Sequence, residues 1–220
     1  RGANNPARRL KKYNGTVQSD GLEVYELIAK AYPNMVHYQC LVHGRRKFEA
    51  ALSNDAKRAE YALSVFQEVY AIERQAKENN LTDEELFKLR QEKSRPLLED
   101  LFNWLEAEQY KVLPKEPIGK AIAYMLNRKA GLLHYLTDAK LLPDTNLVEN
   151  AIRPVAVGRK NYLFAGSHDA AQWAAIFYSF FACCKANNID PYEWLIDVMQ
   201  RLNTTSIQNL EELLPHKWTK

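Results

Sequence analysis

Hydrophobic and polar positions predict two short strands near the start of the chain. Residues 15–20 form a short β-favouring run that follows a turn and ends at Asp20, and Gly21 then opens a predicted helix. Residues 35–40 are a second run rich in β-favouring residues, and a predicted helix extends from there through Leu52. The order strand, helix, strand, helix is typical of a layered α/β unit.

From about residue 55 the pattern changes to helical spacing without any strand signal. Three stripes of apolar residues recur every three or four positions, and their members are Tyr61, Val65, Phe66, Val69 and Tyr70; Leu97, Leu98, Leu101, Phe102 and Leu105; and Ile118, Ile122, Met125 and Leu126. Residues 55–140 are therefore predicted to form an all-helical insertion in the α/β unit. Its charged positions are expected on the solvated surface, among them Glu84, Glu85, Lys88 and Arg90.

The last third of the chain is also predicted to be helical. A helix should begin between residues 144 and 146, and Pro154 is expected to end or kink it at Arg153. A long helix with an apolar face should follow Ser167, and Asp190 should begin another. The predicted fold class is α/β, predominantly helical, divided into residues 1–54, 55–140, 141–188 and 189–220.

Composition fits an ordinary globular protein. The chain has 220 residues, of which 46% are hydrophobic and 26% charged, which excludes a disordered tail, a collagen-like repeat or a disulfide scaffold. Its three cysteines are odd in number and two are adjacent, as suits a reducing cytosol. No apolar run approaches the roughly 18 residues of a membrane span. We therefore expect a cytoplasmic protein with no membrane partner.

The net charge of +3 hides an uneven distribution. Residues 1–19 carry five cations and no acid, so this leader is +5 and the rest of the chain sums to −2. The chain begins at Arg1 and lacks the apolar stretch of a signal peptide. We interpret it as a piece of a longer protein.

Asp20 is the first carboxylate of the chain and stands where a predicted strand ends. In an open α/β sheet, functional side chains gather at the carboxyl ends of strands. An aspartate at this position can equally be a helix N-cap or a turn residue. Asp20 is therefore a candidate site residue with a structural alternative.

Glu149 is the second candidate carboxylate. On the predicted helix it shares one face with Asn146, three residues before, and Arg153, four residues after. These neighbours could form a capping box and an ion pair. Alternatively, the carboxylate could bind a metal while nearby polar groups hold phosphates. The polar groups that follow are Arg153, Arg159, Lys160 and Asn161.

Cys40 and His43 have the spacing of half a zinc site. A complete site needs another pair, and Cys183 and Cys184 are adjacent residues on a predicted helix, so a structural role for Cys40 and His43 is favoured. The sequence contains no glycine-rich phosphate loop and no nucleophile elbow, which argues against nucleotide-driven chemistry and serine hydrolysis. A basic run, more often solvated surface than a DNA contact, follows His43 and consists of Arg45, Arg46 and Lys47.

Taken together, these segments resemble the transposases of the bacterial insertion-sequence family numbered sixty-six. The resemblance covers nearly the whole chain from about Asn14, and its most specific element is the run from Arg159 to Ser167. The segments that carry it are Gln18–Gly21, Cys40–Phe48, Asn146–Pro154, Gly158–Ser167, Asp190–Pro191 and Leu213–Trp218.

The resemblance implies a ribonuclease-H-like catalytic domain with an Asp, Asp, Glu triad and a helical insertion before the helix that bears the glutamate. Asp20 takes the place of the second aspartate and Glu149 that of the glutamate. The first aspartate has no counterpart, because no acid precedes Asp20. We therefore expect this chain by itself to be inactive. Two positions depart from the family pattern: Leu41 stands in place of Trp, and Thr145 stands in place of Asn. Neither position touches a presumed metal ligand.

The implied activity is metal-dependent DNA cleavage and strand transfer at transposon ends. In such enzymes carboxylates hold two cations, usually Mg²⁺, about 4 Å apart. The implied partners are DNA and further copies of the protein. The resemblance gives Cys40, His43, Asn146 and Asn161 the part of structural motif residues. DNA-backbone contacts are expected from Arg45, Arg46, Lys47, Arg153, Arg159 and Lys160. The alternatives are a non-catalytic helical module for DNA binding or assembly, and a Cys/His zinc module.

Overall fold

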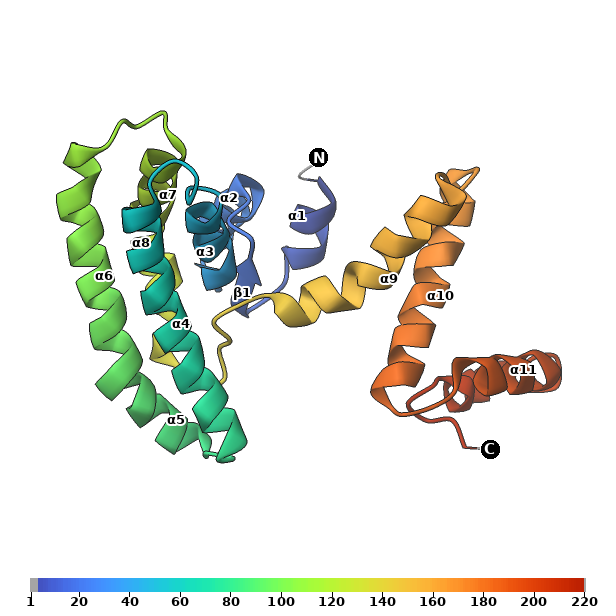
Figure 1. Cartoon of the computed structure of the whole chain (residues 1–220). Helices are drawn as coiled ribbons and strands as arrows, with labels where there is room; N and C mark the ends of the chain where they lie inside the picture. The colour runs from blue at the N-terminus through green and yellow to red at the C-terminus, as the bar shows by residue number, and fades with distance from the viewer. Residues whose placement is uncertain (1–3, 220) are drawn as a thin grey trace. The chain divides into compact units, whose positions relative to one another are not determined.

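The computed structural model describes residues 4–219 and is predominantly helical, with one small parallel sheet (Figure 1). Strands β1 (Gly15–Ser19) and β2 (Met35–Gln39) pair from Gly15 opposite Met35 to Ser19 opposite Gln39. Helix α2 (Glu23–Ala31) forms the crossover that a parallel pair requires. Both predicted strands and the helix between them are confirmed, and each strand ends one residue earlier than expected.

The chain forms two compact units, residues 1–145 and residues 146–220. Arg1 of the basic leader lies outside the described residues; the leader's other cations lie in and just after α1 (Asn4–Leu10). The four-part division expected from the sequence stays a prediction.

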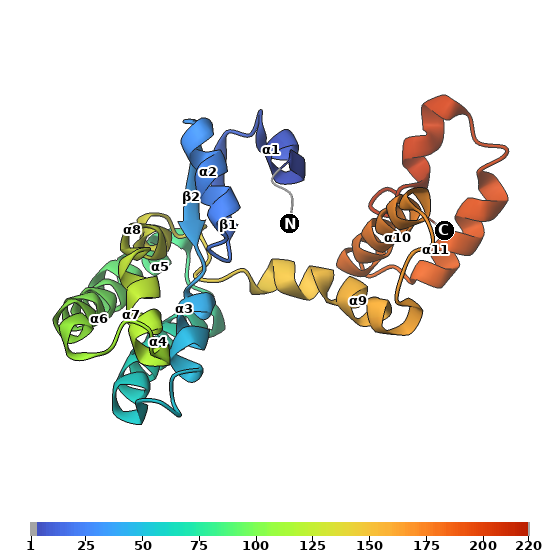
Figure 2. The ribbon, with the colours of Figure 1, turned by 90° about the horizontal axis from the view of Figure 1, so that it is seen from above.

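In the first unit, a helical bundle follows the sheet. Helices α3, α4, α6 and α7 pack against one another, as Figure 2 shows from above. The elements after β2 are α3 (Leu41–Glu49), α4 (Ala56–Glu78), α5 (Asp83–Leu89), the π-helical turn η1 (Arg90–Ser94), α6 (Arg95–Glu108), the 3₁₀ turn η2 (Gln109–Lys111), α7 (Pro117–Leu126), α8 (Lys129–Leu133) and the 3₁₀ turn η3 (His134–Thr137).

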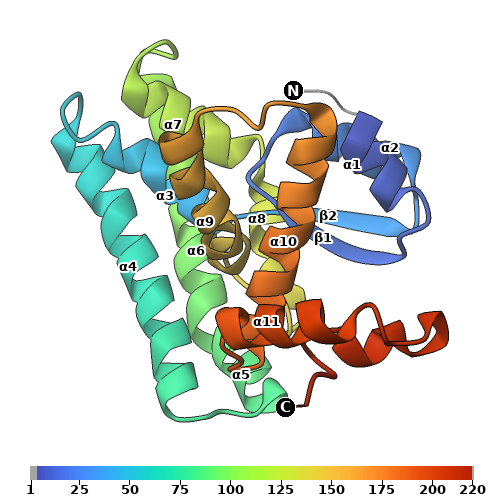
Figure 3. The ribbon, with the colours of Figure 1, turned by 90° about the vertical axis from the view of Figure 1, so that its right-hand side faces the viewer.

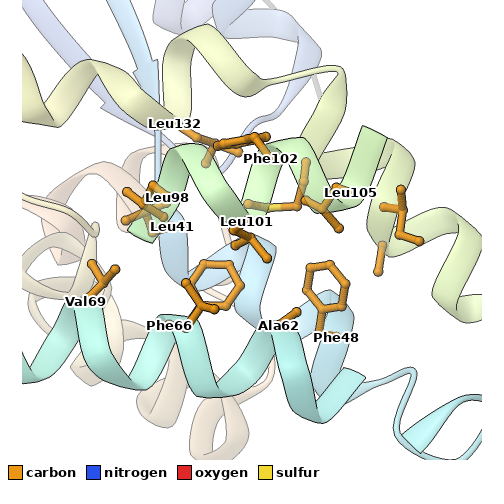
Figure 4. Packing of buried hydrophobic residues seen from close by; sticks show 14 of the residues in the cluster. Leu41, Phe48, Ala62, Phe66, Val69, Leu98, Leu101, Phe102, Leu105 and Leu132 are labelled. Carbon is orange, nitrogen blue, oxygen red and sulfur yellow. The ribbon is translucent and has the colours of Figure 1, made fainter. Parts of the chain in front are cut away.

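One hydrophobic core joins the bundle to the α/β part (Figure 4). Leu41 and Phe48 on α3 are fully buried and belong to the same cluster as Phe66 on α4 and Phe102 on α6. Each such side chain contributes roughly 1.5–3 kcal/mol by leaving water. Because α3 directly follows β2, the helical insertion and the sheet are parts of one folded unit. The three apolar stripes predicted from the sequence supply half of the buried residues of this core.

Arg90 departs from its expected place on the solvated surface. Its side chain is only 1% exposed and lies in the π-helical turn. The expectation was wrong because a charged residue on a polar stretch can be buried when a carboxylate and several carbonyls surround it. Glu73 on α4 supplies that carboxylate, at 2.8 Å.

The second unit is a chain of helices in which α10 contacts both α9 and α11 (Figure 3). Ser167 and Asp190 cap the amino ends of α10 and α11 by accepting backbone N–H bonds. Trp194 donates its indole N–H to the carbonyl of Leu213 at 2.9 Å, which ties α11 to the last turn. The elements are α9 (Asn146–Tyr162), α10 (His168–Ala186), α11 (Pro191–Arg201) and the 3₁₀ turn η4 (Ile207–Leu213).

Pro154 does not end its helix. Helix α9 begins at Asn146, within the expected range, and continues through Pro154 to Tyr162. A proline removes one backbone hydrogen bond and crowds the preceding turn. Here both Pro154 and Asn150, whose carbonyl loses its N–H partner, are exposed to solvent. Water can therefore satisfy that carbonyl, and regular turns on both sides carry the helix past the proline.

Within residues 4–219, no helix is both long enough and apolar enough to cross a membrane.

Candidate active site

Asp20 lies directly after β1, at the carboxyl end of the parallel pair. Its side chain is exposed, and Oδ1 accepts the backbone N–H of Leu22 at 3.2 Å. This bond shapes a turn in which Gly21 has a φ of +77°, a conformation that residues with a Cβ rarely adopt. Asp20 thus presents a solvent-accessible carboxylate on a defined turn at a strand end.

The carboxyl end of α7 and the residues after it hold this turn from outside. Tyr124 donates its hydroxyl to the carbonyl of Asp20 at 3.3 Å, and Arg128 donates from Nη2 to the carbonyl of Gly21 at 3.3 Å. The Arg128 guanidinium also lies 4.4 Å from the centre of the Tyr124 ring. A Cβ added at Gly21 would lie 2.8 Å from the Tyr124 hydroxyl, so this close approach requires glycine.

A polar pair lies beneath the turn. The hydroxyl of buried Ser19 and Nε2 of His37 on β2 form a hydrogen bond of 2.8 Å, and Ser19 Oγ accepts the N–H of Gly21 at 3.3 Å. Burial lowers the pKa of His37 below its ordinary value of 6.5, and the carboxylates of Glu26 and Asp20 oppose this shift. The lowered pKa favours a neutral imidazole at pH 7 next to the Asp20 turn.

A segment of irregular backbone, residues 138–145, crosses the carboxyl ends of both strands; we call it the strap. Gln18 on β1 donates from Nε2 to the carbonyl of Leu142 at 2.8 Å. The N–H of Leu41 donates to the carbonyl of Pro143 at 2.9 Å. The N–H of Thr145 donates to the buried sulfur of Cys40 at 3.4 Å. The strap leads directly into α9, in which Glu149 is half-buried.

Arg90 holds the other end of the strap. Its Nε and Nη2 donate to the two carboxylate oxygens of Glu73, each at 2.8 Å. Its Nη1 lies within hydrogen-bond distance of four backbone carbonyls, those of Tyr135 (3.2 Å), Asp138 (3.0 Å), Ala139 (3.3 Å) and Leu141 (3.0 Å). One buried side chain therefore links α4, the π-helical turn and the start of the strap.

Of the three predicted DNA-binding cations in the first unit, Lys47 lies beside the side chains that hold the Asp20 turn. Lys47 on α3 lies 5.7 Å from the centre of the Tyr124 ring, on which Arg128 also lies. Arg45 forms an exposed ion pair with Glu49 at 2.7 Å, and Arg46 is exposed. The remaining predicted contacts are all exposed on α9 of the second unit: Arg153, Arg159 and Lys160. The motif residue Asn161 is also exposed on α9.

The two carboxylates that the sequence predicted for one site lie in different units of the structure. Asp20 belongs to the first unit, whereas Glu149 and Asn146 belong to the second. Among residues 4–219, no group of three or more His, Cys, Asp or Glu side chains could hold a metal ion. Within this part of the chain, Cys40 and His43 therefore do not belong to a group of three or more such side chains that could bind zinc. For Mg²⁺, the exposed carboxylate of Asp20 has the hard oxygen atoms that this ion prefers.

Sequence reasoning missed four residues that shape this region: Gln18, Arg90, Tyr124 and Arg128. Gln18 had a local signal, because it stands two residues before Asp20 at the end of the same predicted strand. The other three act over separations of 45 to 107 residues, which no local pattern encodes.

Comparison with known proteins identifies the class. The sequence profile of the transposase IS66 family matches residues 1–173, and that of the IS66 C-terminal element matches residues 179–216. The chain therefore belongs to the IS66 transposase family.

Three relatives come from Sinorhizobium fredii (strain NBRC 101917 / NGR234) and bear the names "Uncharacterized protein" y4hP, y4jD and y4qI. The first is 36% identical over 98% of this chain and 42% of its own length. The second is 32% identical over 99% and 44%, and the third 33% identical over 98% and 41%. The chain thus spans less than half the length of these relatives. No solved structure matches it.

Proposed function

We propose that the chain is part of the catalytic region of a DNA transposase, with a partial ribonuclease-H-like fold in which Asp20 and Glu149 bind divalent cations. Family membership supports the class of enzyme. The parallel pair with Asp20 directly after its first strand supports the site, because functional side chains of α/β sheets lie at carboxyl ends of strands.

The anchored strap is the observation that carries the pairing of the two carboxylates. Thr145 is bonded to Cys40, and the N–H of Cys40 donates to the carbonyl of Ser19 at 3.1 Å, one residue before Asp20. Glu149 follows Thr145 by four residues, which span at most about 14 Å of chain. Glu149 thus follows, four residues later, a segment fixed at the edge of the sheet that carries Asp20.

The two carboxylates would hold Mg²⁺ through their oxygens. When bound, such ions activate the attacking hydroxyl and stabilise the leaving oxygen. The chain's own residues give Asp20 an exposed carboxylate on a turn fixed by Tyr124 and Arg128. Since no acid precedes Asp20 in these 220 residues, we propose that the chain alone does not cleave DNA and that the full-length protein supplies a further carboxylate.

The substrate in this proposal is the DNA of transposon ends and target, bound by a homo-oligomer. Exposed cations would neutralise phosphates without reading sequence. Among the proposed contacts of the first unit, Lys47 is the best placed for this role, because it shares the Tyr124 ring with Arg128 beside the Asp20 turn. The other proposed contacts are Arg45, Arg46, Arg153, Arg159 and Lys160.

The test is cleavage of transposon-end DNA by a full-length protein that contains this chain. Asp20→Asn and Glu149→Gln should each lower the cleavage rate by at least about 100-fold, because either change removes a metal-binding charge. The matched controls Asp100→Asn and Glu84→Gln alter exposed carboxylates on α6 and α5 and should leave the rate unchanged.

Wild-type cleavage by both site variants would contradict the proposal. That result would favour the alternative in which the helical bundle at residues 55–138 acts as a non-catalytic DNA-binding or assembly module. Metal analysis of the purified chain would decide the zinc alternative.

A further inference from the structure

The strap depends on side chains from other elements for its hydrogen bonds. Residues 138–145 contain no helix or strand, so their backbone groups find no partners in a regular ladder. Backbone carbonyls removed from water must find other donors. Arg90 supplies donors near the start of the strap, and Gln18 supplies one further along.

Arg90 is suited to this role because its charge is already balanced. Glu73 occupies Nε and Nη2 of the guanidinium, which leaves Nη1 directed at the carbonyls. The side chain is only 1% exposed, and its guanidinium carbon lies 5.0 Å from the centre of the Tyr135 ring. A guanidinium with a fixed fork of donors can hold a turn of carbonyls in one arrangement.

Gln18 connects the strap to the strand that precedes Asp20. Its Nε2 donates to the carbonyl of Leu142, 124 residues away in sequence. Further along the strap, the carbonyl of Pro143 accepts the N–H of Leu41, and the N–H of Thr145 donates to the sulfur of Cys40. Three successive attachments thus hold the end of the strap at the carboxyl edge of the sheet, and α9 begins one residue after Thr145.

We propose that Gln18 and Arg90 are positioning residues that fix the strap at the carboxyl edge of the sheet and thereby fix where the helix bearing Glu149 begins. This inference rests on the proposed function, in which Glu149 binds a metal. It also explains what the helical insertion contributes to the site. Arg90 on the π-helical turn holds the segment that precedes Glu149, and Tyr124 and Arg128 hold the turn that contains Asp20.

The first test measures the attachment itself in the 220-residue chain. Gln18→Met keeps the length of the side chain and removes its N–H donor; Gln67→Met is the matched control at an exposed position on α4. Hydrogen exchange is followed at the amides of Leu41 and Thr145, which donate to Pro143 and Cys40. Gln18→Met should speed exchange at both amides roughly two- to tenfold, the effect of losing one hydrogen bond. Gln67→Met should leave both rates unchanged.

The second test uses transposon-end cleavage by the full-length protein. Gln18→Met should raise the Mg²⁺ concentration for half-maximal rate several-fold and lower kcat, while KM for DNA stays as in the wild type. A residue that only stabilises the fold would not shift the Mg²⁺ requirement at a temperature where both proteins are folded. Glu149→Gln, measured alongside, reports on the proposed function.

The outcomes distinguish the positioning role of Gln18 from the proposed function of Glu149. The positioning role is overturned if amide exchange in Gln18→Met is unchanged, or if exchange is faster but the Mg²⁺ requirement is unchanged. In either case, an inactive Glu149→Gln variant still supports the proposed function. Wild-type activity of Glu149→Gln overturns the proposed function and with it the catalytic purpose of the strap. Faster exchange together with the raised Mg²⁺ requirement supports the inference.

Discussion

Arg90 and Glu73 form a paired contact in the first unit, with Nε bonded to Oε1 and Nη2 bonded to Oε2, each at 2.8 Å. Two parallel bonds of this kind match the planar guanidinium to the carboxylate. The Arg90 side chain is 1% exposed and that of Glu73 is 15% exposed. If one partner is removed, water therefore cannot take over its hydrogen bonds to the other.

Removing Arg90 alone should therefore destabilise the fold strongly. We expect Arg90→Met to lower the free energy of unfolding by about 3–5 kcal/mol, because Glu73 and the carbonyls of the strap lose their donor. Glu73→Gln combined with Arg90→Met should cost less than the sum of the two single changes. Urea unfolding of the wild type and the three variants measures this coupling, and strictly additive losses would contradict it.

The contact between Gly21 and Tyr124 gives a second prediction. Gly21→Ala should lower the free energy of unfolding by about 1–2 kcal/mol for the positive φ, and further for the Cβ placed 2.8 Å from the Tyr124 hydroxyl. In a Tyr124→Phe background the second part should shrink, because that hydroxyl is gone and Arg128 Nε at 3.0 Å is the remaining close atom. Equal losses in both backgrounds, measured by chemical denaturation, would refute the close approach.

The stability of the first unit should depend on pH through Arg58 and its carboxylate partners. Hydrogen bonds from Lys111 and Arg58 lower the pKa of Glu108 below 4.5, and hydrogen bonds from Arg58 lower the pKa of Asp55 below 3.8. Because the folded values are the lower ones, the unfolded chain binds more protons in acid. The stabilisation is complete above about pH 4.5 and is lost as the pH falls through the folded values.

Urea unfolding at a series of pH values between about 5 and 2 tests this dependence. Wild-type protein should lose more stability over that range than Arg58→Met, whose two carboxylates lack their shared partner at 2.7 and 2.6 Å. An identical slope in both proteins would count against the assigned cause.

DNA binding by the full-length protein should depend on salt through the cations of α9. Arg159→Ala and Lys160→Ala should each weaken binding equally for different sequences and reduce the slope of log K against log salt by about 0.9. Lys88→Ala is the control, because Lys88 lies exposed on α5 with Glu92 at 3.8 Å. A loss that varies with DNA sequence would indicate base contacts instead.

Local patterns predicted the elements of this fold well. The runs at residues 15–20 and 35–40 became strands because their residues favour extended backbone and the helix between them permits a parallel pair. Asp190 caps α11 as its position before Pro191 indicated. In each case the cause lies within a few residues of the effect, which is the range over which a sequence pattern is informative.

The candidate site was only partly predictable. Asp20 was expected at a strand end because strand and turn are local, but the strap was not, since Arg90 bonds carbonyls 45 to 51 residues away. Arg90 was expected on the surface because charge alone does not reveal a buried partner. Pro154 was expected to end or kink α9, and whether a helix continues past a proline depends on solvent at the orphaned carbonyl.

The π-helical turn at Arg90–Ser94 also takes up an extra residue within one continuous helical rod. A regular α-helix rotates by about 100° per residue about its axis. A π-helical turn holds more residues and so rotates by a smaller angle per residue. Before it, α5 buries none of its described residues; after it, α6 buries Leu98, Leu101, Phe102 and Leu105. Deleting Gln91 would let this turn close as a regular α-helical turn, and the leucines of α6 would keep facing the core.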